Sequence, residues 1–191
     1  MAEQEEEEEE ESLYEACITN VFWDLEDFPV PPGRKLDRKF AHNMESTLEL
    51  EGYIGDLKIW AYGGEKPPKV ARKLDDHLGF IDIMLLQKTD SKRARLNKMI
   101  LDMIYCVYEN PLYRTFRFKI NLVVIAKDIP GEDTDLFPVL GELKRKQCNV
   151  NVILAIPDDW PSKEHYPHPV ADLVWHWTRL FDGEEPIESD T

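Results

Sequence analysis

The sequence predicts an α/β fold, in which a mostly parallel sheet of about five strands is flanked by helices. Short apolar runs of strand length alternate along the chain with longer segments whose apolar residues recur at helical spacing. Strands that alternate with helices pair in parallel through right-handed crossovers, so helices cover both faces of the sheet. The 191 residues, of which 42% are hydrophobic, suffice for one domain with a sizeable core.

The predicted strands are apolar runs that end at turn-forming residues. The first is followed by polar residues at 24–27 and by three nearby prolines, which interrupt a strand. The second ends at the pair Gly63 and Gly64. In order, the predicted strands span residues 17–23, 57–62, 80–86, 121–126 and 150–156.

The predicted helices carry apolar residues at intervals of three or four. In the first of them, Phe40, Met44 and Leu48 lie on one side. The helix at 92–109 is apolar nearly all round, and we therefore expect it to be substantially buried. The last is a Trp-rich helix that closes the fold. In order, the predicted helices span residues 37–50, 70–78, 92–109, 137–146 and 171–181.

The acidic charge of the chain is concentrated at its ends. The formal net charge is -15, from 38 acidic and 23 basic side chains, but thirteen of the acids lie in residues 1–11 and 182–190. We predict that residues 1–11 and 182–191 are disordered acidic tails and that residues 12–181 form the domain. The body is then nearly neutral, so the charge of the whole chain does not exclude binding to RNA.

Several classes of site and compartment lack their usual signals. Cys17, Cys106 and Cys148 are odd in number and widely spaced, which favours a reducing compartment over a disulfide framework or a zinc site. No glycine-rich phosphate loop follows a strand, so we expect no nucleotide cofactor. No signal or transit peptide is seen, and no apolar run approaches the roughly 20 residues of a membrane span. We expect an intracellular protein, cytoplasmic or nuclear, that does not bind membranes.

Carboxylates follow the predicted strands at the edge where α/β sheets form their sites. Asp24 follows the first strand, Asp133 and Asp135 follow the fourth, and Asp102 lies within the apolar helix. Clustered carboxylates need a compensating cation, and their hard oxygens favour Mg²⁺ or Mn²⁺. This pattern is compatible with metal-assisted hydrolysis of a phosphodiester. The alternative interpretation is that these acids are ordinary loop residues and helix caps.

Basic residues lie near the same edge. Arg34 and Lys35 follow the first strand, and Lys92, Arg93 and Arg95 open the helix that contains Asp102. Cations in these places are candidates for binding RNA phosphates. The alternative is that they lie on solvated surfaces and pair with neighbouring acids.

Five stretches of the chain, in order, resemble the plant-type NYN domains of the PIN-like nuclease superfamily. Residues 21–27 read Val-Phe-Trp-Asp-Leu-Glu-Asp and are similar to the Trp-Asp-x-Glu-Asn opening of that family. Similar matches follow at Ala-Tyr-Gly-Gly (61–64), Ile-Leu-Asp-Met (100–103) with Asn110 and Pro111, Glu-Asp-Thr-Asp-Leu (132–136), and Val-Trp-His-Trp-Thr (174–178). The resemblance covers residues 18–181.

The resemblance implies a PIN-like three-layer sandwich and a metal-dependent ribonuclease. Carried over residue by residue, it makes Asp24, Asp102, Asp133 and Asp135 both the catalytic residues and the ligands of Mg²⁺ or Mn²⁺. The protein partners and the RNA target do not follow from it.

The chain also departs from the pattern of the family. Asp27 stands where the family usually has asparagine, Leu96 where a second helix aspartate precedes Asp102, and Glu132 where a glycine precedes Asp133. These departures keep a second hypothesis open beside the ribonuclease. In that hypothesis the chain is a catalytically degenerate NYN domain that serves as an RNA-binding or protein-interaction module.

Overall fold

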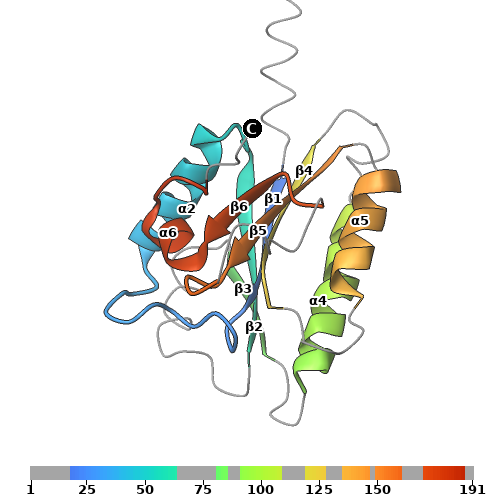
Figure 1. The fold of residues 1–191 in the computed structure, drawn as a ribbon, viewed down its shortest axis with the longest axis horizontal. Helices are drawn as coiled ribbons and strands as arrows, with labels where there is room; N and C mark the ends of the chain where they lie inside the picture. Colours follow the sequence, from blue (N-terminus) through green and yellow to red (C-terminus); the bar gives the residue numbers. More distant parts are fainter. Residues whose placement is uncertain are drawn as a thin grey trace, which may run out of the picture.

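The described part of the structure is built on a parallel six-stranded sheet (Figure 1). The structure is a computed structural model that describes residues 18–63, 81–85, 91–108, 119–127, 135–146, 149–160 and 170–187. The strand order is β3-β2-β1-β4-β5-β6, and every neighbouring pair is parallel. The strands are β1 (Ile18–Asp24), β2 (Asp56–Gly63), β3 (Ile81–Leu85), β4 (Ile120–Ile125), β5 (Val150–Ile156) and β6 (Leu173–His176).

Helices cover both faces of this sheet and complete three layers. On one face lie α2 (Arg38–Leu50) and α6 (Trp177–Asp182), and on the other lie α4 (Lys92–Tyr108) and α5 (Leu136–Lys146) (Figure 1). The α/β class predicted from the sequence is confirmed. The predicted helix at 70–78 lies outside the described residues.

The strand order reverses between β1 and β4, which places the end of β1 at the topological switch point of the sheet. Successive side chains of a strand point to opposite faces. Val21 and Trp23 pack in the core under α2 and α6, whereas Phe22 packs in the core under α4 and α5. Asp24, two residues after Phe22, therefore faces α4. Ligand sites of α/β sheets form at such switch points, beyond the carboxyl ends of the strands.

An aromatic cluster joins α6 and α2 to the sheet. The ring centroid of Trp23 lies 5.0 Å from that of Trp177 and 5.7 Å from that of Phe40. The indole N–H of Trp177 donates to the carbonyl of Pro29 at 3.0 Å, so the polar atom of this buried ring is satisfied. The tryptophans of the closing segment are thus packing residues.

The predicted closing helix at 171–181 is wrong in its first half. Residues Leu173–His176 form β6, which pairs with β5 in the register Leu154↔Val174, and the helix begins only at Trp177. Just before β6, the carboxylate of Asp172 accepts a hydrogen bond from the backbone N–H of Val152 at 2.8 Å, which holds the start of β6 against β5. Over so short a segment, periodicity does not separate a helix from a strand plus a turn. The described sheet therefore has six strands rather than five.

Residues 182–187, which the sequence assigned to an acidic tail, lie against the domain. The carbonyl of Glu184 accepts hydrogen bonds from the indole of Trp175 and the hydroxyl of Thr47, and the N–H of Ile187 donates to the carbonyl of Val174. Residues 1–17 and 188–191 lie outside the described part. Within that part, no helix combines the length and the apolar composition that crossing a membrane requires.

Gly183 ends α6 in a conformation that a larger residue cannot share. Its φ is +78°, and a Cβ added there would lie 2.9 Å from Cβ of Asn43 in α2. Gly183→Ala should lower the free energy of unfolding by about 2 kcal/mol or more in urea titrations, because it combines backbone strain with a clash. Gly52→Ala is the matched control, since Gly52 has φ +82° but open space around it. Gly52→Ala should lower the free energy of unfolding by only about 1 kcal/mol. Equal losses in the two variants would show that the contact with Asn43 does not affect stability.

Candidate functional site

The carboxyl edge of the sheet holds an ion pair between the central strand and α4. Asp24 ends β1 with its side chain fully buried, and the Nε atom of Arg95 lies 3.2 Å from Oδ1 and 3.3 Å from Oδ2 of its carboxylate. The backbone N–H of Glu26 donates to Oδ1 at 3.0 Å. The Arg95 side chain is only 12% exposed. Both carboxylate oxygens of Asp24 therefore already have partners within the protein.

Burial dominates the titration of Asp24. Its loss of hydration raises the pKa of the carboxyl above the ordinary value; the charge of Arg95 and the N–H of Glu26 oppose the rise, and the charge of Asp27 adds to it. Between the ordinary pKa and this raised one, the folded protein binds more protons at Asp24 than the unfolded chain does. The contribution of Asp24 to stability therefore falls as the pH rises through that window.

Asp24→Asn should remove this pH dependence. As the pH rises from about 4 to 7, the free energy of unfolding of the wild type should fall relative to that of Asp24→Asn. Only the wild type ionises a buried carboxyl over this range. Urea titrations at several pH values measure it. Glu49→Gln, which removes an exposed carboxylate of α2, controls for the general loss of a negative charge. A constant difference for Asp24→Asn across this range would contradict the raised pKa.

A second ion pair lies beside the first. Oδ2 of Asp27, which stands where the NYN pattern has asparagine, is 2.6 Å from Nζ of Lys92. Lys92 and Arg95 are one turn apart at the start of α4. Asp27 is thus paired with Lys92, as Asp24 is paired with Arg95.

Asp102, further along α4, also has both carboxylate oxygens in contact with side chains of the protein. Its Oδ2 accepts a hydrogen bond from the hydroxyl of Tyr62 at 2.9 Å, and its Oδ1 pairs with Lys98, one turn earlier in the helix. Burial and the adjacent Asp102 raise the pKa of Tyr62, so its hydroxyl stays protonated and remains a donor. Asp102 follows Arg95 by seven residues, about 10 Å along the helix axis. Its partner Tyr62 is the register neighbour of Asp24 on β2.

Cys106, one turn beyond Asp102, is not an activated thiol. Burial raises its pKa to about 11, against a lowering by Lys58, and the charge of Asp102 adds to the rise. A thiol in this state is protonated at neutral pH, which agrees with its interpretation as a small packing residue.

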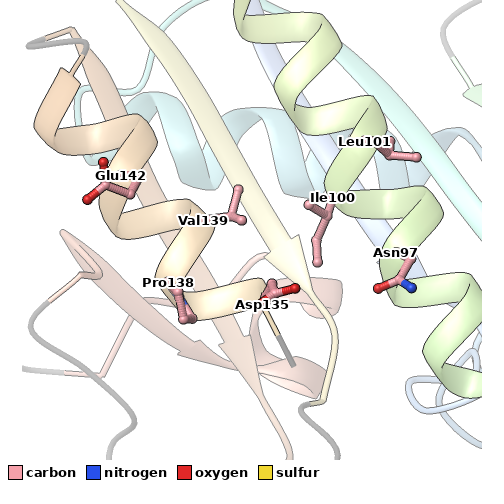
Figure 2. A pocket seen from close by; sticks show the side chains of 7 residues that line it. All are labelled: Asn97, Ile100, Leu101, Asp135, Pro138, Val139 and Glu142. Atoms are coloured by element: carbon pink, nitrogen blue, oxygen red, sulfur yellow. The ribbon is translucent and has the colours of Figure 1, made fainter. Parts of the chain in front are cut away.

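Asp135 is exposed and immediately precedes α5. It lies on the rim of a pocket of about 450 Å³ between α4 and α5. Figure 2 shows Asp135 and Asn97 pointing toward one another across this pocket, with Ile100 between them. Asp133, the fourth acid of the predicted site, lies outside the described residues.

The described carboxylates do not fit a metal site as they lie. Among the residues that the structure describes, no three side chains of Asp, Glu, His or Cys are placed to hold a metal ion together. Asp24 and Asp102 have their oxygens engaged by protein donors. Because Asp133 is not described, the complete set of four acids stays a prediction.

The five predicted RNA-binding cations divide into two groups. Arg34, Lys92 and Arg95 are paired with acids, Arg34 with Asp182 through two hydrogen bonds of 2.7 and 3.2 Å. Lys35 and Arg93 are exposed and make no ion pair with another described residue. The alternative interpretation from the sequence, that cations pair with neighbouring acids, therefore holds for three of the five.

Sequence reasoning missed an exposed row of residues on α4. We expected this helix to be substantially buried, but Leu101, Tyr105 and Tyr108 are 62%, 64% and 46% exposed. They continue a row that begins with Arg93 and Asn97, both also exposed. We call these five residues the α4 outer row. Their spacing of three or four residues, opposite the buried Leu96, Met99 and Met103, was the signal that could have revealed them.

Comparison with known protein families gives one finding. Residues 18–167 match the NYN domain. No curated protein matches the chain significantly. The matched segment begins with β1 and includes Asp24, Arg95, Asp102 and Asp135, and it ends before β6. Since the match covers most of the 191 residues, the chain belongs to the NYN domain family.

Proposed function

We propose that this NYN domain binds single-stranded RNA along the α4 outer row. NYN domains are generally nucleic-acid-binding. The observation that carries the proposal is that α4 presents Arg93, Asn97, Tyr105 and Tyr108 to solvent in a single row, which starts at the carboxyl edge of the sheet. A guanidinium contacts phosphates, and exposed tyrosine rings stack on unpaired bases without needing a particular sequence. The row contains no acid that would repel the RNA backbone.

Two substitutions test this surface. Tyr105→Ala should weaken binding to a labelled single-stranded RNA about tenfold, because one stacked base contributes roughly 1–3 kcal/mol. Arg93→Glu should weaken binding and reduce the dependence of log K on log salt by about one phosphate contact or more. Fluorescence anisotropy at several salt concentrations measures both effects.

The control for Arg93→Glu is Lys39→Glu. Lys39 is an exposed cation of α2, on the opposite face of the sheet, and the change in net charge is the same. Equal losses of affinity in the two variants would mean that only the total charge of the protein matters. Unchanged affinity in both Arg93→Glu and Tyr105→Ala would eliminate the α4 outer row as the binding surface.

A metal-dependent ribonuclease is the second candidate. The NYN family suggests ribonuclease activity, and its nuclease domains are generally metal-dependent. The observation that favours it here is Asp24, a carboxylate fully buried at the switch point of the sheet. Labelled RNA should be incubated with Mn²⁺, Mg²⁺ or a chelator, with Asp24→Asn in parallel. Cleavage that needs the metal and is lost in Asp24→Asn would establish this candidate; binding without cleavage supports the first.

A further inference from the structure

We infer that α4 supplies, through Lys92, Arg95 and Lys98, the positive charge that a divalent metal ion would otherwise bring to these carboxylates. Each cation is paired with one acid: Lys92 with Asp27, Arg95 with Asp24 and Lys98 with Asp102. Three carboxylates against three cations leave no formal net charge. These three acids therefore need no metal to balance their charge, and in this arrangement Arg95 opposes the binding of one at Asp24.

The spacing of the three cations explains how one helix forms ion pairs with three acids. Positions 92, 95 and 98 follow one another at intervals of three, so they stay on one side of α4 while descending along it. The pairs run along α4 from Asp27 and Asp24 to Asp102, whose partner Tyr62 is the register neighbour of Asp24 on β2. Lys92 and Arg95 are largely buried beside the strand end, whereas Lys98, whose side chain is 37% exposed, flanks the α4 outer row.

The opposition to a metal follows from the contact between Arg95 and Asp24. A metal ion bound to Asp24 would compete for the two carboxylate oxygens that lie 3.2 and 3.3 Å from Nε of Arg95. It would also place two positive charges beside a guanidinium that is itself nearly buried, where repulsion is poorly screened. Arg95 and a metal ion are thus competing partners of the same carboxylate.

Removing Arg95 should convert the edge into a weak metal site. Asp24 and Asp27 are paired with two cations that are one turn apart on α4, so the loss of Arg95 leaves the buried carboxylate of Asp24 without its counter-charge near the Asp27–Lys92 pair. Two adjacent carboxylates attract a hard divalent cation. This consequence does not depend on RNA binding, so a failure of the RNA experiments would leave it standing.

The test is a comparison of metal binding and thermal unfolding, with Mn²⁺ alone as the probe. For the wild type, Tm should be the same in Mn²⁺ and in chelator, and calorimetric titration should show no Mn²⁺ uptake that Asp24→Asn removes. Arg95→Met should unfold at a lower temperature in chelator and regain about 3 °C or more in millimolar Mn²⁺. Arg93→Met, on the exposed side of the same helix, should behave as the wild type does.

Two results would overturn the inference. One is Mn²⁺ uptake by the wild type that disappears in Asp24→Asn. The other is a folded Arg95→Met protein whose Tm and calorimetric titration do not respond to Mn²⁺. If Arg95→Met does not fold, Arg95→Gln takes its place, because it removes the positive charge beside Asp24 but keeps a side-chain N–H that can donate to this carboxylate. Its Tm should also rise in Mn²⁺, and a Tm that does not rise counts against the inference.

Discussion

Replacing Leu96 by aspartate should cost at least about 4 kcal/mol of the free energy of unfolding. Leu96 is 1% exposed and packs in the core under α4 with Phe22 and Tyr62. The substitution removes a buried leucine, worth about 2–5 kcal/mol when truncated, and adds a carboxyl group to an apolar core. Urea unfolding at pH 7, followed by circular dichroism, measures the loss. It bears directly on the resemblance to NYN domains, which suggests an aspartate at this position.

The matched control is Leu101→Asp on the same helix. Leu101 is 62% exposed, so the same chemical change there should alter stability by no more than about 0.5 kcal/mol. Should Leu96→Asp retain wild-type stability, position 96 would tolerate a carboxylate, and a single substitution could restore that feature of the family. The expected loss means instead that the surrounding core has adapted to leucine.

Arg95→Met should lower the free energy of unfolding by about 3 kcal/mol at pH 7. Breaking a buried ion pair by removing one partner leaves the other charge desolvated and uncompensated, which typically costs 3–5 kcal/mol. Here the remaining charge is Asp24, whose side chain is fully buried. The cost has an upper limit because Asp24 can take up a proton, and it should shrink as the pH falls for the same reason.

A double-mutant cycle isolates the pair. Adding Asp24→Asn to Arg95→Met should restore most of the lost stability, since the double variant buries no charge at this position. Arg93→Met is the control for the loss of an arginine, with an expected change within about 0.5 kcal/mol. Additive losses in the cycle would show that the contact seen between Arg95 and Asp24 does not stabilise the fold.

Local pattern was sufficient for elements whose burial follows from their own sequence periodicity. The predicted strand at 150–156 has the same bounds as β5, and the predicted helix at 37–50 differs from α2 by one residue. In both, burial and periodicity follow directly from the order of apolar residues. The segment at 171–181 failed because its first half gains its hydrogen bonds from β5, a partner that no local pattern reveals.

The candidate site was less accessible to sequence reasoning. That Asp24 follows a strand could be predicted from the apolar run before it, but its partner Arg95 lies 71 residues later. The order of residues does not show whether a carboxylate will contact a cation, a metal ion or water. Its partner depends on which face of a helix packs over the end of the strand. The level of Asp102 relative to Asp24 likewise depends on where α4 begins above the sheet.

The segment after α6 has a consequence for how the protein behaves at high concentration. An outer strand of a sheet presents unpaired N–H and carbonyl groups, which can recruit a strand from another molecule. The hydrogen bond from Ile187 to Val174 occupies part of β6, the outer strand on that side of the sheet. The acids at 184 and 185 add negative charge beside it. We therefore expect these C-terminal residues to hinder the pairing of β6 with a strand of another molecule.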